Sequence, residues 1–259
     1  MTDGAETAVE ALGGLLKRGQ PAVLVTVIAI EGDPPSSPGA KLLFSGGRIV
    51  AGTLGCSEFD TAGAGIAAEL AQPQAAHPDR GSAGAVTLRR RAVFGHGSEQ
   101  VLDLFAERFD PAPGAIVAGD NPVGRSVAEL AGLIGWRTRV LGREADPVDD
   151  LTQRPPGPRD AVVVSDHDAP WAAGVLKLAL ASEAFFVGML GSRRHAPRVI
   201  EQLRATGVAP DRLAGLHTPC GLDLGARTPN EIGLSIVAEM LAVARGRPGG
   251  SLKSLPEPH

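Results

Sequence analysis

A strand, a glycine and two arginines in the second half of the chain could together bind an anion. Residues 185–194 are expected to form a buried strand that ends near Gly191, followed by Ser192, Arg193 and Arg194 at the start of a helix. Backbone N–H groups, the helix dipole and two guanidinium groups would then point at one place. This combination favours a phosphate or a similar anionic group.

A second segment, residues 217–229, predicts a glycine-rich loop that leads into a helix with strong start signals. Thr228 is a natural N-cap, Pro229 takes the first helical position, and Glu231 stands three residues after the cap, which predicts a capping box. Because the exit of this long loop is held in place, we expect the loop to bind a ligand.

These segments resemble the XdhC/CoxI family of xanthine dehydrogenase accessory proteins. The stretches that carry the resemblance are Val187–Arg194, Gly221–Ile232, Val25–Val27, Gly39–Leu43 and Gly52–Gly55. The resemblance covers most of the chain, and it implies an α/β protein. A C-terminal Rossmann-like domain, with a doubly wound parallel sheet, would follow a smaller N-terminal α+β domain.

The resemblance also implies a function. Members of the family are cytoplasmic maturation factors that bind the molybdenum cofactor (molybdopterin) as cargo, support its sulfuration and insert it into a molybdenum hydroxylase. We therefore expect a non-catalytic chaperone whose partner is an apo molybdenum hydroxylase subunit, such as that of xanthine dehydrogenase or carbon monoxide dehydrogenase. A cysteine desulfurase and a molybdopterin-synthesis enzyme are further expected partners, and a homodimer is the expected assembly. The alternative is an NAD(P)-dependent oxidoreductase.

On this hypothesis the phosphate of the cofactor lies near Ser192–Arg194 and its molybdenum near Cys56. The expected cofactor-binding residues are Cys56, His167, Gly191, Ser192, Arg193, Arg194, Asp223 and Gly225, with Cys56 also the candidate metal ligand. Asp223 has two interpretations, since it could hydrogen-bond a pterin-like heterocycle or cap the local backbone.

Cys56 also has two interpretations. It precedes a predicted helix in a glycine-rich turn, where the dipole and the backbone N–H groups favour a thiolate that could ligate molybdenum or relay sulfur. The family carries its cysteine slightly later than this chain does, and the other interpretation is a small buried hydrophobe. Cys220 stands where relatives have an aliphatic residue, so we expect it to pack in the core.

Among the histidines, His167 is favoured as a site residue because it follows the third strand of the second domain. Open α/β sheets bind ligands at the carboxyl ends of their strands. The remaining histidines show no paired metal-ligand spacing, and His217 is a further candidate because it lies beside the glycine-rich loop.

The first turn of the second domain argues against NAD(P) as a cofactor. A dinucleotide site needs Gly-x-Gly-x-x-Gly, but here Asn121 stands between Gly119 and Gly124. Asp120 adds a negative charge where a phosphate would lie. The second strand lacks an acidic residue for the ribose, and Arg143 is either a contact for a 2′-phosphate or an exposed turn residue.

Composition narrows the class of protein. The chain of 259 residues has a net charge of −4, 3% aromatic residues and no tyrosine, which argues against a nucleic-acid partner. We find no secretory signal and no membrane-spanning run, and two cysteines in such a chain indicate a reduced cytoplasmic protein.

The expected elements divide the chain into residues 1–110, residues 111–247 and a flexible tail at 248–259, with the linker at Asp110–Gly114. In the first part we expect helices at 5–17, 58–70 and about 100–107, and strands at 22–30, 42–44, 48–51, 85–88 and 92–94. In the second part we expect strands at 115–118, 138–141, 161–164 and 185–189, and helices at 123–134, 170–181, 196–205 and 229–244. Their alternation is typical of a parallel doubly wound sheet.

Overall fold

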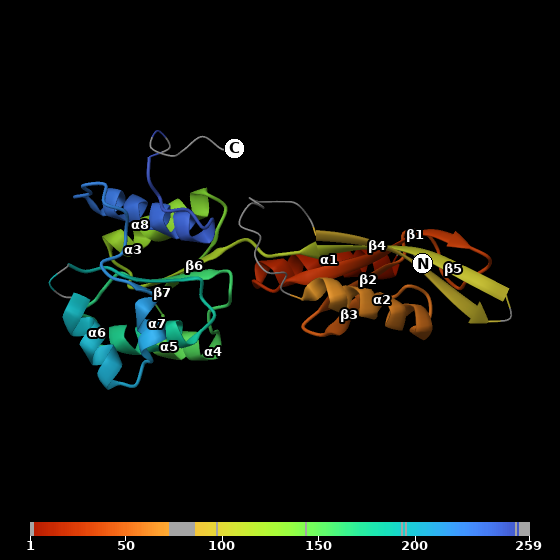
Figure 1. The fold of residues 1–259 in the computed structure, drawn as a ribbon, viewed down its shortest axis with the longest axis horizontal. Helices are drawn as coiled ribbons and strands as arrows, with labels where there is room; N and C mark the ends of the chain where they lie inside the picture. The colour runs from red at the N-terminus through yellow and green to blue at the C-terminus, as the bar shows by residue number, and fades with distance from the viewer. Residues whose placement is uncertain are drawn as a thin grey trace. The chain divides into compact units, whose positions relative to one another are not determined.

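The computed structural model describes residues 3–72, 86–96, 98–142, 144–192, 194, 196–251 and 253. They form two compact units, the first ending at Pro111 and the second beginning at Ala112 (Figure 1). Among the described residues, no helix combines the length and the apolar character needed to cross a lipid bilayer.

Unit 1 is an antiparallel sheet with one helix on each face. Its elements are α1 (Asp3–Lys17), β1 (Ala22–Glu31), β2 (Lys41–Ser45), β3 (Arg48–Gly52), α2 (Ser57–Ala71), β4 (Val86–His96) and β5 (Ser98–Phe109). The strand order is β3-β2-β1-β5-β4. Because side chains alternate along β1, Leu24 packs under α1 with Leu12, whereas Val25 packs under α2 with Phe59.

The predicted hairpin between β2 and β3 is confirmed. Gly46 and Gly47 form its turn with φ values of +58° and +78°, as a two-residue type I′ turn requires.

The helix expected near residues 100–107 is wrong, because this segment forms most of strand β5. Leu102, Leu104 and Ala106 alternate along one face and are fully buried, or nearly so, in the core shared with α2. β5 pairs with β1 on one side and β4 on the other. A short apolar run of this kind suits either a helix or a strand, so tertiary pairing decided between them.

The two short strands expected at 85–88 and 92–94 are one strand, β4, over its described residues. It continues through Arg89, Arg90 and Arg91, whose exposed side chains interrupt the apolar pattern. β4 is an edge strand of its sheet, and charged side chains at such a position discourage pairing with another chain.

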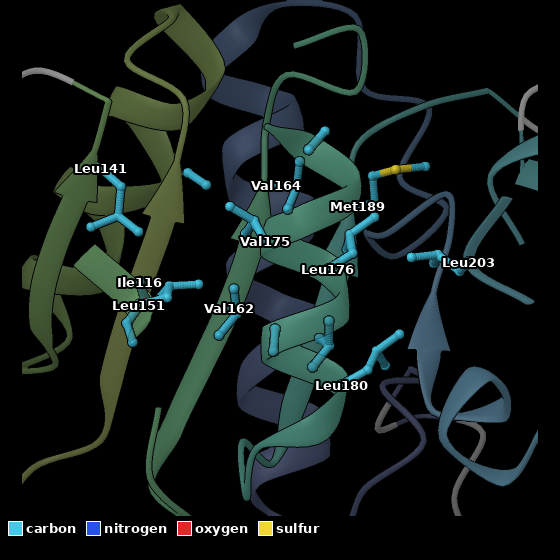
Figure 2. Close-up of a cluster of buried hydrophobic side chains, with 14 of the residues drawn as sticks. Ile116, Leu141, Leu151, Val162, Val164, Val175, Leu176, Leu180, Met189 and Leu203 are labelled. Atoms are coloured by element: carbon cyan, nitrogen blue, oxygen red, sulfur yellow. The ribbon is translucent and has the colours of Figure 1, made fainter. Parts of the chain in front are cut away.

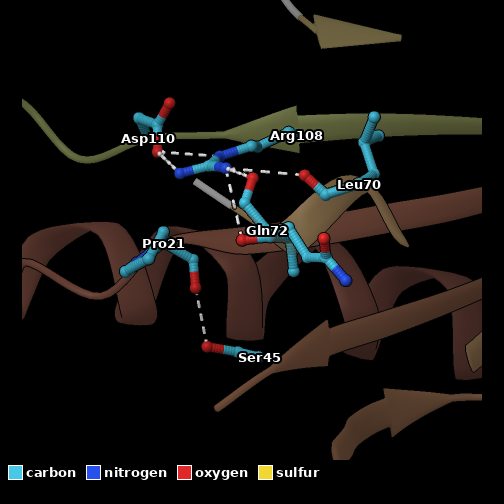
Figure 3. A network of polar contacts seen from close by, with 7 residues as sticks. Pro21, Ser45, Leu70, Gln72, Arg108 and Asp110 are labelled. Carbon is cyan, nitrogen blue, oxygen red and sulfur yellow. Dashed lines mark hydrogen bonds and ion pairs between the residues drawn. The ribbon is translucent and has the colours of Figure 1, made fainter. Parts of the chain in front are cut away.

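An arginine closes the C-terminal end of α2 (Figure 3). Arg108 donates from Nη1 to the carbonyl oxygens of Leu70, Ala71 and Gln72 at 3.5, 3.3 and 2.9 Å, and it also contacts Asp110 Oδ1 at 3.1 Å. The last carbonyls of a helix have no partner within it, and the negative end of the dipole favours a cation. Arg108 thus ties the end of α2 to the end of β5.

Unit 2 has the Rossmann-like, doubly wound fold expected from the sequence. Its elements are β6 (Gly114–Ala118), α3 (Pro122–Leu133), β7 (Arg137–Leu141), α4 (Pro147–Gln153), β8 (Asp160–Val164), α5 (Ala172–Ala181), β9 (Phe186–Met189), α6 (Ala196–Ala205), α7 (Pro210–Ala214), β10 (Leu216–His217) and α8 (Pro229–Ala244). All paired strands are parallel, in the order β10-β9-β8-β6-β7. The short elements α4, α7 and β10 were not expected.

Helices cover both faces of the parallel sheet, with α3 and α8 on one side and α4 to α7 on the other (Figure 1). Figure 2 shows the core on the second side, where Val162 and Val164 of β8 meet Val175 and Leu176 of α5. Each of these four side chains is fully buried. This packing fixes the strand ends from which the candidate site loops emerge.

Candidate functional site

The turn after β6 is filled by one of its own side chains. Asn121 is the N-cap of α3, and its Oδ1 accepts a hydrogen bond from the N–H of Gly124 at 2.8 Å. Its Nδ2 donates to the carbonyl oxygen of Ser165 at 2.9 Å, just beyond the end of β8. The turn therefore uses the Gly124 N–H internally and bridges two adjacent strand ends.

The two glycines of this turn are explained by close packing. A Cβ added at Gly119, where φ is +111°, would lie 2.6 Å from Oγ of Ser165, and one at Gly124 would lie 2.7 Å from the same atom. Asp120 forms an ion pair with Arg125 at 3.0 Å, so part of its charge is compensated locally. The fold alone accounts for these residue types.

The turn after β9 is arranged differently. Ser192 and Arg194 are exposed and Gly191 is half-buried, between the end of β9 and the start of α6. The carbonyl of Ser192 accepts a bond from the N–H of Ala196 at 3.2 Å, which begins the helix. Arg193 lies outside the described residues. Ser192 and Arg194 are thus placed at a helix start, as the sequence predicted.

His167 emerges at the same edge as this turn, because β8 and β9 are adjacent and parallel. Its Nε2 lies 3.5 Å from Oδ2 of Asp168, and its side chain is 27% exposed. The N–H of Leu190 donates to the carbonyl of Val164 at 2.8 Å, so the two strands stay paired up to their carboxyl ends. His167 and Ser192 therefore lie on loops from neighbouring strand ends.

The glycine-rich loop begins at this edge as well. β10 pairs with β9, and the N–H of Cys220 donates to the carbonyl of Met189 at 3.1 Å. Asp223 and Gly225 are exposed farther along the loop. Among the described residues, no group hydrogen-bonds the Asp223 carboxylate, so the capping interpretation has no support there.

The exit of the loop is fixed by the predicted capping box, which is confirmed. Thr228 Oγ1 accepts from the N–H of Glu231 at 3.3 Å, and Glu231 Oε2 accepts from the N–H groups of Thr228 and Arg227 at 2.9 and 2.7 Å. The hydrogen bonds from Thr228 and then from Arg227 hold the pKa of Glu231 below its ordinary value.

Glu239 of α8 holds the other end of the loop and was not anticipated. Its Oε1 lies 2.9 Å from Nδ1 of His217, and its Oε2 accepts from the N–H of Gly221 at 2.5 Å. Burial raises the pKa of Glu239, but the bonds from His217 and Gly221 outweigh it and leave this pKa lowered. The sequence held one signal that could have revealed Glu239, namely that it is the single carboxylate in the otherwise apolar run 236–243.

The two cysteines have different surroundings. Cys56 is half-buried at the N-cap position of α2, has no side-chain capping bond, and packs against the core of unit 1. Its burial fits the hydrophobe interpretation and its place at a helix start fits the thiolate interpretation. Cys220 is buried, as expected, and burial followed by the charge of Glu239 raises its pKa to about 12. Cys220 is therefore a neutral packing residue.

The loop before Cys56 is ordered by one carboxylate. Asp60 Oδ1 accepts from the N–H of Leu54 at 2.6 Å and from Oγ1 of Thr53 at 3.1 Å. Within the described ranges, no three histidine, cysteine, aspartate or glutamate side chains gather in a way that could hold a metal ion. Cys56 is accordingly a single candidate ligand and belongs to no such cluster of three among the described residues.

Comparison with known proteins agrees with the two-part organisation. The XdhC Rossmann domain matches residues 115–240, and the XdhC and CoxI family matches residues 15–77. Three curated relatives are similar at low identity. The uncharacterized protein YqeB of Escherichia coli K12 is 26% identical, and the match covers 89% of this chain and 45% of that protein.

A probable xanthine dehydrogenase subunit of Bacillus subtilis 168 is 28% identical, over 55% of this chain and 46% of that protein. The molybdenum cofactor insertion chaperone PaoD of Escherichia coli K12 is 24% identical, over 55% of this chain and 43% of that protein. The chain spans less than half the length of each of these relatives. With both parts of the family matched in sequence and a Rossmann-like second unit, the chain belongs to the XdhC/CoxI family.

Proposed function

We propose that this chain binds the molybdenum cofactor and supports its insertion into a molybdenum hydroxylase such as xanthine dehydrogenase. Family membership supports the proposal, as do the names of two relatives, a molybdenum cofactor insertion chaperone and a probable xanthine dehydrogenase subunit. The observation that carries it is the gathering of three loops, bearing His167, Ser192 and Asp223, at the ends of β8, β9 and β10.

These loops offer complementary chemistry to an anionic pterin. The helix start at Ser192, with Arg194 and its neighbour Arg193 in the sequence, suits the phosphate because N–H groups and guanidinium groups both donate to phosphate oxygens. The exposed carboxylate of Asp223 can accept the adjacent N–H donors of a pterin ring. His167 and Gly225 complete the proposed contacts, and Gly191 lets the backbone approach the ligand.

The proposed role is binding and delivery, without catalysis by this chain. The residues gathered in unit 2 can hold an anion and a heterocycle, which is what a cargo protein requires. Cys56 is proposed as a thiolate ligand for molybdenum, with sulfur relay as a second use of the same atom. The proposed partners are a cysteine desulfurase, a molybdopterin-synthesis enzyme and the apo form of a molybdenum hydroxylase, and a homodimer is the proposed assembly.

Co-purification tests the proposal. The protein would be expressed in a host that makes molybdopterin and in a host that does not, and bound pterin would be measured by the fluorescence of its oxidised form. We expect close to one pterin per chain from the first host only, together with transfer to a purified apo-hydroxylase that restores its activity. A protein that emerges without pterin from both hosts would contradict the proposal.

A further inference from the structure

Two glutamates of one helix hold the two ends of the glycine-rich loop. Glu231 accepts from the N–H groups of Arg227 and Thr228 at the exit, and Glu239 accepts from the N–H of Gly221 at the entrance. Between them, among the described residues, only the N–H of Leu222 bonds to α8, by donating to the carbonyl oxygen of Ser235 at 3.1 Å. The exposed tip, residues 223–225, therefore projects from a loop that is held at both ends.

The entrance is the tighter of the two ends. A Cβ on Gly221, where φ is +110°, would lie 2.6 Å from Oγ of Ser235, so the loop backbone is pressed against α8. Glu239 is half-buried, whereas Glu231 is exposed. Hydrogen bonds to a partly buried carboxylate order their donors more strongly than bonds at an exposed one.

The same carboxylate sets the orientation of His217. The pKa of Glu239 is lowered, so its carboxylate is ionised near neutral pH and can only accept a hydrogen bond. The His217 atom that faces it, Nδ1, must therefore carry the proton. The imidazole also rests on the buried ring of Phe186, with ring centroids 4.4 Å apart. Nε2 makes no hydrogen bond within the described part of the chain.

We infer that Glu239 is the positioning residue of this site: through His217 and Gly221 it holds the loop in the conformation that presents Asp223 to the ligand. The inference rests on the proposed function for the identity of that ligand, but not for the ordering of the loop. His217 stacks on Phe186 and is paired at the sheet edge, so Glu239 links the loop to the parallel sheet of unit 2.

Three variants test the inference. Glu239→Leu removes both acceptors at similar volume. Glu239→Gln is the conservative change, because its amide can accept from Gly221 and donate to Nδ1 of the other His217 tautomer. Glu129→Leu, an exposed glutamate on α3, is the matched control. Readouts are hydrogen exchange at the Gly221 amide, ¹⁵N shifts of the His217 ring, the urea midpoint, and affinity for molybdenum cofactor released from a purified molybdoenzyme.

In Glu239→Leu we expect exchange at Gly221 to accelerate at least about tenfold and cofactor affinity to fall about tenfold, as for the loss of one or two hydrogen bonds to a charged group. Glu239→Gln should restore both to within about threefold while moving the ring proton of His217 to Nε2. Glu129→Leu should change neither. If Glu239→Leu does not fold, His217→Phe, which breaks only one bond, should weaken cofactor binding a few-fold and keep Gly221 protected.

The inference is overturned if Gly221 exchange is unchanged in Glu239→Leu, or if that variant lowers the urea midpoint and leaves affinity as in the wild type. If the wild-type protein binds no cofactor, but Gly221 exchange accelerates in Glu239→Leu and the His217 ring proton moves to Nε2 in Glu239→Gln, the proposed function is refuted and the positioning role is supported. The two failures are therefore distinguishable.

Discussion

Two turns of the same parallel sheet join a strand to a helix through a glycine, yet they are built for different purposes. The turn after β6 is closed by Asn121, whose side chain accepts a hydrogen bond from the N–H of Gly124 and donates one to the carbonyl oxygen of Ser165. The turn after β9 leaves Ser192 and Arg194 exposed. A glycine-rich turn is thus a candidate anion site only where its donors are not used by the protein.

The comparison also separates two reasons for a glycine. At Gly124 a side chain would strike the carbonyl oxygen of Gly119, so the residue serves helix packing. At Gly191 a Cβ would lie 3.7 Å from Cε of Met189, which is ordinary contact, so packing does not require glycine there. Substitutions in the turn after β6 should therefore lower the stability of the protein, whereas substitutions in the turn after β9 should lower its affinity for the cofactor.

The largest effect is expected at the turn after β9, which we call the open turn, in contrast to the closed turn after β6. Replacing Arg193 and Arg194 together by alanine should weaken cofactor binding by about tenfold to a hundredfold, because a charge-assisted hydrogen bond contributes roughly 1.5–3 kcal/mol. Titration with cofactor from a purified molybdoenzyme measures it, and Arg198→Ala, an exposed arginine on α6, is the control. Unchanged affinity in a folded double variant would mean that the pair is only a solvated helix start.

At the closed turn the effect should be on stability instead. Gly124→Ala would force a Cβ against Gly119 and Ser165 and should lower the free energy of unfolding by about 2 kcal/mol, within the range for overpacking. Urea denaturation measures it, with Gly132→Ala, where the nearest atom is 4.0 Å away, as the control. If both variants are equally stable, the close packing around Gly124 does not require a glycine at that position.

A smaller loss is expected from removing the cap. Asn121→Ala deletes the bonds to Gly124 and Ser165, and an N-cap substitution of this kind costs about 1 kcal/mol. Its effect on cofactor affinity should be within error, since the open turn is untouched. Loss of cofactor binding without loss of stability would show that the β6 turn belongs to the site.

The smallest effect is expected for dinucleotides. Wild type and Asn121→Gly should both bind NADH and NADPH no more tightly than the high-micromolar range, roughly −5.5 kcal/mol, because opening the turn leaves Asp120 in place and supplies no acidic ribose contact. Calorimetric titration measures both ligands. A low-micromolar dissociation constant for either protein would remove the distinction between the two turns.

Much of unit 2 could be predicted from sequence because its signals are local. The capping box at Thr228 and Glu231 depends on residues three apart, and strands such as β8 are short apolar runs between polar turns. The loops after β8 and β9 then follow from the parallel order of the strands, whereas β10, which brings the third loop to the same edge, was not expected. The helix expected at 100–107 was wrong because its apolar residues fit both periodicities until β1 and β4 paired with them.

The sequence by itself determined the family, the two-part organisation of its matches, and the residue types offered at the strand ends. Only the tertiary structure decided which of those groups are already used. Asn121 finds Ser165, 44 residues away, and Glu239 finds His217 and Gly221 across a folded loop. Hydrogen-bond partners far apart in the chain depend on three-dimensional packing, and no local pattern of residues encodes them.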